Sequence, residues 1–143
     1  MRKIKRITLV VLLMGCIVII IGGALCNNIF NIDSGSSAPA PKAPTIITTP
    51  ARIITSNSAQ LAGTLNPNGA TTTVYFNYGL TTSYTVTTTS QTFDAVGGTS
   101  FFEVEYSVDI GGLSANTEYN FRLVGTNAVG TTYGNNLTFT TAP

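Results

Sequence analysis

The chain has 143 residues, of which 43% are hydrophobic and only 9% are charged, with a formal net charge of +1 and no histidine. Both of its cysteines, Cys16 and Cys26, lie in an apolar N-terminal run, and no lysine follows Lys42. The rest of the chain therefore lacks the side chains for cysteine–histidine metal centres, histidine-based catalytic dyads and triads, and Schiff-base chemistry. We expect no enzymatic activity and no cofactor.

Charge is distributed unevenly along the chain. Four bases lie within the first six residues, whereas residues 44–143 hold two arginines against five carboxylates, a net charge of −3. Affinity for nucleic acid depends on lysine and arginine side chains that neutralise phosphates. An acidic domain without a basic stripe therefore argues against a nucleic-acid partner.

The first predicted element is a transmembrane helix over residues 7–26, behind a basic end of residues 1–6. The run from Ile7 to Leu25 is uncharged and almost wholly apolar, and its 19 residues would span about 28 Å as a helix. That length is close to a hydrocarbon core of about 30 Å. The bases before the run predict a cytoplasmic N-terminus and an extracellular C-terminal domain, with the membrane as a partner through this run.

Two other interpretations of the N-terminal run remain open. A secretory signal cleaved after Ala24-Leu25-Cys26 would release a secreted module. A lipid-modified cysteine is the other, although neither Cys16 nor Cys26 follows the usual pattern of a Leu and two small residues. The simplest interpretation of both thiols is that they are small apolar side chains in the membrane.

Residues 27–43 form the predicted linker, which contains the small, Pro- and Ser-rich stretch SGSSAPAPKAP. Such a composition cannot bury a core, and it predicts a semi-extended spacer.

Residues 44–143 form the predicted domain, in which short segments of alternating apolar and polar residues are separated by Gly-, Pro- and Asn-containing turns. The pattern predicts an all-β domain, and seven strands in about 100 residues match the size of an immunoglobulin-like sandwich. The expected strands are residues 45–49, 59–66, 72–78, 84–89, 101–110, 118–126 and 136–141.

The fifth expected strand, FFEVEYSVDI, alternates most clearly. Its apolar residues, from Phe102 to Ile110, are predicted to face the core, and its carboxylates Glu103, Glu105 and Asp109 to face solvent. Carboxylates two residues apart on a strand are compatible with glycoside hydrolysis or weak surface Ca²⁺ binding. Because an exposed strand face needs polar residues in any case, a solubilising role is the simplest interpretation.

The stretch LSANTEYNFRLVGTNAVG, Leu113 to Gly130, predicts a pinned corner. A Tyr at the start of a strand, here Tyr119, is expected to bury its ring and to bond its hydroxyl to backbone a few residues upstream. Leu113 is expected to fill the core beneath it. The turn from Asn127 to Gly130 is expected to use a positive φ at Gly130.

This stretch resembles the fibronectin type III domain family, and the resemblance covers residues 44–143. The matching residues in the corner and the following strand and turn are Leu113, Thr117, Tyr119, Phe121, Leu123, Asn127 and Gly130. The earlier LAGTLNPNG and VYFNYGLTTSY look like a prokaryotic extracellular subgroup. The sequence departs from the family at Ala115, where Pro is usual, and at Leu65, where many members bury a Trp. It has no Arg-Gly-Asp tripeptide, so integrin binding is not implied.

The resemblance implies a seven-stranded sandwich. Together with the predicted membrane helix, it predicts a membrane-anchored extracellular module for non-catalytic protein–protein interaction, adhesion or envelope structure, with an unknown protein or glycan partner. Alternatives are a secreted carbohydrate- or protein-binding module and a self-assembling surface subunit. Contacts are expected in loops, which tolerate variation without disturbing a core. The candidate contact residues are Asn66, Asn68, Thr81, Ser83, Asp94 and Thr99.

Two further surface features are candidates for carbohydrate. Tyr75, Tyr84 and Tyr133 are predicted to be exposed or near loops, where an aromatic ring can stack on a sugar, although single exposed tyrosines are common on sandwiches. Asn136 begins an Asn-Leu-Thr sequon for N-glycosylation.

Overall fold

The structure is a computed structural model that describes residues 12–13, 16–17, 39–95 and 102–143. The chain divides into two units, Met1–Ser36 and Ser37–Pro143. In the first unit, β1 (Leu12–Leu13) pairs antiparallel with β2 (Cys16–Ile17). The rest of the expected membrane helix over residues 7–26 lies outside the described residues, so that helix stays a prediction. Within the described ranges, no helix has the length and apolar character needed to cross a membrane.

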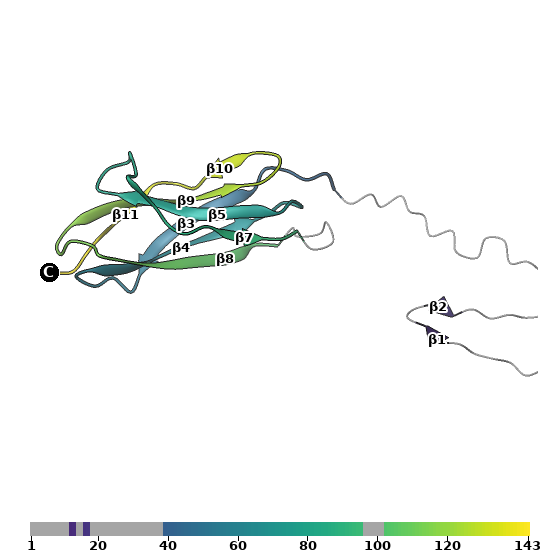
Figure 1. The fold of residues 1–143 in the computed structure, drawn as a ribbon, viewed down its shortest axis with the longest axis horizontal. Helices are drawn as coiled ribbons and strands as arrows, with labels where there is room; N and C mark the ends of the chain where they lie inside the picture. The colour runs from purple at the N-terminus through teal and green to yellow at the C-terminus, as the bar shows by residue number, and fades with distance from the viewer. Residues whose placement is uncertain (1–11, 14–15, 18–38, 96–101) are drawn as a thin grey trace, which may run out of the picture. The chain divides into compact units, whose positions relative to one another are not determined.

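The second unit is a β-sandwich without a helix in its described residues, which confirms the all-β sandwich part of the prediction (Figure 1). One sheet has the order β3-β4-β8, formed by β3 (Thr45–Arg52), β4 (Ser58–Asn66) and β8 (Val104–Gly111). The other has the order β10-β9-β5-β6, and β11 also pairs with β9 while β7 pairs with β5. Its strands are β5 (Thr72–Gly79), β6 (Val86–Thr87), β7 (Gln91–Phe93), β9 (Glu118–Thr126), β10 (Thr131–Tyr133) and β11 (Leu137–Thr140).

The outer strands of the second sheet are interrupted, which the sequence pattern did not predict. The expected strand over residues 84–89 is reduced to β6, with β7 following it, and β10 precedes the expected last strand. At each break a threonine hydroxyl replaces a ladder carbonyl: Phe76 N–H donates to Thr88 Oγ1 at 2.9 Å, and Leu123 N–H donates to Thr48 Oγ1 at 3.1 Å. Because Thr48 belongs to β3, the second bond also ties the two sheets together.

Phe102 is not in the core, which corrects the expected register of the fifth strand. Its side chain is 79% exposed, and β8 begins only at Val104. The reason is the length of its partner: β4 ends at Asn66, and the last matched pair is Leu65 with Val104. Phe102 therefore has no matched residue on β4 to pack against.

The core lies between the sheets and is made of apolar side chains from both. Phe76 and Phe121 are completely buried, and Phe76 stacks on Tyr106 of the opposite sheet with ring centroids 5.5 Å apart. Burying side chains of this size stabilises the fold by about 1.5–3 kcal/mol each. The cluster consists of Ile46, Ala59, Leu61, Leu65, Val74, Phe76, Ile110, Leu113, Tyr119, Phe121, Leu123 and Phe139.

The corner before β9 is fastened by two hydroxyls. The Ser114 N–H donates to the Tyr119 hydroxyl at 3.0 Å, and Leu113 packs in the core with 8% of its surface exposed. Thr141 Oγ1 donates to the Ser114 carbonyl at 2.6 Å and accepts from the Thr117 N–H at 2.9 Å. The sequence suggested the tyrosine but gave no sign of the contribution of Thr141 from the end of the chain.

The turn between β9 and β10 does not use a positive φ at Gly130, contrary to expectation. Asn127 forms the turn instead, because its Oδ1 accepts from the backbone N–H groups of Val129 at 2.9 Å and Gly130 at 3.1 Å. A side-chain acceptor of this kind holds the turn in ordinary backbone conformations.

Candidate functional site

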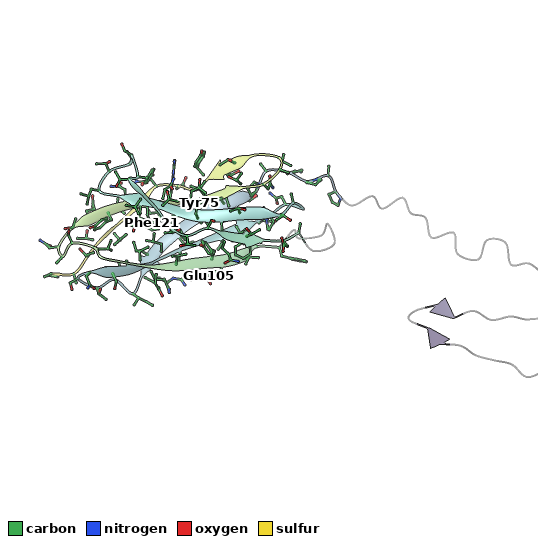
Figure 2. The ribbon with its side chains drawn as sticks, viewed as in Figure 1. Tyr75, Glu105 and Phe121 are labelled. Carbon is green, nitrogen blue, oxygen red and sulfur yellow. The ribbon has the colours of Figure 1, made fainter. Side chains whose placement is uncertain are left out.

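Three tyrosines and one arginine form what we call the tyrosine–arginine cluster, on the outer face of the second sheet. Tyr75 on β5 and Tyr133 on β10 are each paired with Val124 of β9, from opposite sides. Residues directly paired across strands present their side chains on the same face. Figure 2 shows Tyr75 and Glu105 on different sides of Phe121, which lies between the sheets. The members are Tyr75, Tyr84, Arg122 and Tyr133.

Arg122 is the centre of the cluster. Its guanidinium carbon lies 4.5 Å from the ring centroid of Tyr84 and 4.3 Å from that of Tyr133. Each such cation–π contact is worth about 0.5–1 kcal/mol at an exposed site. The Nε atom is buried without a hydrogen-bond partner, and no hydrogen bond or ion pair of the guanidinium occurs among the described residues. The rings therefore fix the position of the guanidinium and leave its N–H donors uncommitted.

Tyr84 is held beside Arg122 by a chain of hydrogen bonds. Its hydroxyl donates to Asn136 Oδ1 at 2.8 Å, and Asn136 Nδ2 donates to Asn120 Oδ1 at 3.0 Å. Asn120 Nδ2 donates in turn to the Leu80 carbonyl at 3.2 Å. Tyr84 also has a φ of 44°, a conformation that costs on the order of 1 kcal/mol or more for a residue other than glycine. The contacts of the side chain offset that cost and orient the ring.

Val124 shows how closely the outer face is covered. It is absent from the core cluster, and it alternates with the inward-facing Leu123, yet none of its surface is exposed. Both residues paired with it are tyrosines, and we infer that their side chains cover it. Tyr75 and Tyr133 lie on the strands on either side of β9, so their backbones are about 10 Å apart. The face thus combines a pair of aromatic rings with a fixed cation between strands.

This arrangement suits the binding of a ligand. Aromatic faces pack against apolar surfaces of a ligand, an arginine fork matches a carboxylate or phosphate, and the nearby Asn120 and Asn136 amides suit hydroxyl groups. Within the described ranges there is no group of three or more acidic, His or Cys residues able to hold a metal ion. The cluster offers no nucleophile activated by a neighbouring base.

The acidic row of Glu103, Glu105 and Asp109 has a different character. Glu105 Oε1 lies 2.7 Å from Arg52 Nη1, with both side chains more than half exposed, and Asp109 Oδ1 accepts from Gln60 Nε2 at 2.9 Å. A shallow hollow of about 100 Å³ adjoins the row. Its lining residues are Thr45, Ile47, Thr64, Leu65, Asn66 and Glu103. Two of the carboxylates thus have surface partners, as a solubilising strand face would.

The expected contact loops do not gather at one place. Asn68 fastens the start of the domain, since its Nδ2 donates to the Ala43 carbonyl at 2.7 Å and to Thr45 Oγ1 at 3.0 Å. Asn66 and Asp94 lie at this same end of the sandwich, whereas Thr81 and Ser83 lie in the turn after β5, at the end where the C-terminus emerges (Figure 1). Thr99 lies outside the described residues.

Sequence reasoning singled out the three tyrosines and Asn136 but not Arg122. A signal was present: Arg122 stands between Phe121 and Leu123 on a strand, so alternation puts it on the outer face. It is also one of only two bases in residues 44–143. What the pattern did not contain was the proximity of Tyr84, which comes from a turn 38 positions earlier and reaches Arg122 only because β9 pairs with β5.

No family model matches the chain, and no curated protein does. Solved structures do share its fold. A short form of the sensor domain of the anti-sigma factor RsgI4 in Pseudobacteroides cellulosolvens is 21% identical, with a TM-score of 0.53 over 69% of this chain and 94% of that one. A solution structure of the same sensor domain is 22% identical, with a TM-score of 0.52 over 68% of this chain and 74% of that one. At this identity the likeness shows a common β-sandwich fold and nothing more.

Proposed function

We propose that this protein is a membrane-anchored, non-catalytic binding module whose sandwich is presented outside the cell. The single observation that carries the proposal is the tyrosine–arginine cluster, in which a guanidinium is fixed between two rings and its N–H donors are left uncommitted. Keeping such an arrangement on a surface benefits ligand binding more than stability. The anchor rests on the apolar run from Ile7 to Leu25 and the bases that precede it.

We further propose that the sandwich is of the fibronectin type III kind. In the seven-strand scheme of immunoglobulin-like folds, the first, second and fifth strands share one sheet and the third, sixth and seventh share the other. The orders β3-β4-β8 and β10-β9-β5 support this scheme, with the fourth strand, split into β6 and β7, joined to the third. Because the solved structures that share the fold are sensor domains, we include ligand sensing as one form of the proposed binding role. Because one fold serves many functions, the binding role is inferred from the site and not from the fold.

The orientation is tested in intact cells with an epitope tag after Pro143. Accessibility of the tag to antibody without permeabilisation is expected, together with a full-length mass in the membrane fraction. A tag reached only after permeabilisation would contradict the proposal. A mass that starts near Asn27, found in the medium, would favour the secreted alternative.

The binding role is tested by photo-crosslinking in the native envelope. A photoreactive phenylalanine analogue replaces Tyr133, which is 55% exposed, or, as the control, Ser107 on the outer face of β8. Covalent products from position 133 and none from position 107 are expected. Equal products from both positions, or none from either, would mean that the cluster is not a contact surface.

A further inference from the structure

We propose that the tyrosine–arginine cluster binds uronate-containing polysaccharide, with Arg122 receiving a uronate carboxylate and the tyrosine rings receiving pyranose faces. This inference rests on the proposed function and names its ligand class.

Charge comes first. Residues 44–143 have a net charge of −3, and Arg52, the other arginine of this domain, is paired with Glu105 at 2.7 Å. Arg122 has no carboxylate partner among the described residues. A planar guanidinium donates two parallel hydrogen bonds to one carboxylate, and the flanking rings shield the pair from part of the surrounding water. Because a domain of net negative charge repels a polyanion at long range, the ligand must be recognised by contact at this position.

The surroundings favour a glycan over an acidic peptide. Tyr75 and Tyr133 stand on strands either side of β9, an interval that a disaccharide spans, and their rings provide flat apolar surfaces for pyranose rings. Asn136 accepts from Tyr84 and donates to Asn120, and the second N–H of each amide can donate to a sugar hydroxyl. The cluster lies on the outer face of a sheet, across which an extended chain of sugars can lie. A peptide strand would instead pair with the sheet edge at β10 and would not lie across the outer face of β9 that carries Arg122.

The experiment uses the full-length protein in a neutral detergent, with oligogalacturonate and oligoglucuronate as probes and calorimetry as the readout. The methyl ester of each oligomer is the matched control, because it keeps the sugar rings and removes the charge. We expect the free acids to bind at low salt, with at least tenfold weaker binding for the esters. Binding of neither acid, or equal binding of acid and ester, would overturn the proposal.

Two charge-matched variants decide whether the site is the cluster. Arg122→Gln and Arg52→Gln each remove one positive charge, from opposite outer faces. We expect at least a tenfold loss of affinity for Arg122→Gln and no more than a twofold change for Arg52→Gln. Equal losses would assign binding to overall charge and overturn the proposal. Arg122→Lys keeps the charge without the planar fork and should lose about fivefold.

The rings are tested by Tyr133→Ala, for which we expect about a fivefold loss, against Tyr133→Phe, which should bind within twofold of the wild type. A Tyr133→Ala variant with unchanged affinity would overturn the stacking arrangement. The thermal unfolding midpoint of each variant checks that the fold is intact. If the photo-crosslinks at position 133 form but no uronate binds, the proposed binding role stands and the glycan class is wrong; if neither occurs, both fail.

Discussion

The two outer faces of the sandwich have been built from the same strand alternation and yet differ in how their charges are used. On β8 the acidic row is solvated and partly paired, through Glu105 with Arg52 and Asp109 with Gln60. On β9 the charge of Arg122 is enclosed by rings and has no acidic partner among the described residues. Alternation alone makes a polar outer face. What distinguishes the proposed binding face is a charge held in place by neighbours that do not neutralise it.

The largest expected effect concerns the core that both faces share. Phe121→Ala removes a completely buried ring that contacts Phe76 and Phe139, and it should cost about 3–5 kcal/mol of unfolding free energy. Phe102→Ala is the matched control, since that ring is 79% exposed, and it should change the free energy by less than about 0.5 kcal/mol. Urea unfolding followed by tyrosine fluorescence measures both. Similar losses for the two variants would mean that Phe102 belongs to the core after all.

A variant with a smaller expected effect tests whether Tyr75 and Tyr133 cover β9. Val124→Ala removes two methyl groups from an outward side chain with no exposed surface, which should cost about 1.5 kcal/mol. An ordinary exposed valine on a sheet face would cost much less. Val129→Ala, in the turn and 54% exposed, is the control and should be nearly neutral. A neutral Val124→Ala would show that the rings stand apart and leave the strand open.

The corner before β9 fixes where the strand of the cluster begins. Tyr119→Phe removes the acceptor of the Ser114 N–H and should cost about 1 kcal/mol, measured by the same unfolding experiment. Tyr75→Phe, which alters a hydroxyl on the outer face, should stay within about 0.5 kcal/mol. Equal effects would argue that the Tyr119 hydroxyl has no structural role.

Alkaline pH tests the partly buried tyrosines on the inner faces of the two sheets. Burial raises the pKa of Tyr78 on β5, and the charge of Tyr119 raises it further; burial also raises the pKa of Tyr106 on β8, against a lowering by a hydrogen bond with Thr88. The unfolded chain therefore loses these protons first, at a pKa of about 10. Stability should be unaffected by these groups below about pH 10 and should fall as pH rises through the raised values.

The measurement is the unfolding free energy between pH 9 and pH 11. The double variant Tyr78→Phe and Tyr106→Phe should have a shallower decline than the wild type over this interval. An unchanged slope would mean that neither hydroxyl ionises more readily on unfolding.

How far the sequence predicted this molecule depends on the range of the interactions concerned. The all-β fold and the bounds of β9, residues 118–126, follow from local alternation and turn residues. The exposure of Phe102 does not, because it depends on where β4 ends. The contact of Tyr84 with Arg122 does not either, because it depends on the pairing of β5 with β9 and on a turn conformation with positive φ. Strand formation depends on the local sequence, whereas the site depends on how the strands pair with one another.

The smallest expected effect on stability is that of Arg52→Gln, which is compared with Arg122→Gln. Arg52→Gln breaks an ion pair whose side chains are 55% and 56% exposed, and it should cost no more than about 0.5 kcal/mol, because exposed pairs are screened by water and salt. Arg122→Gln removes two ring contacts and should cost about 1 kcal/mol, with little dependence on salt. Unfolding at low and high salt measures both. If Arg122 were the more salt-sensitive of the two, its charge would act through distant carboxylates and not through Tyr84 and Tyr133, and the contrast between the two faces would be one of degree only.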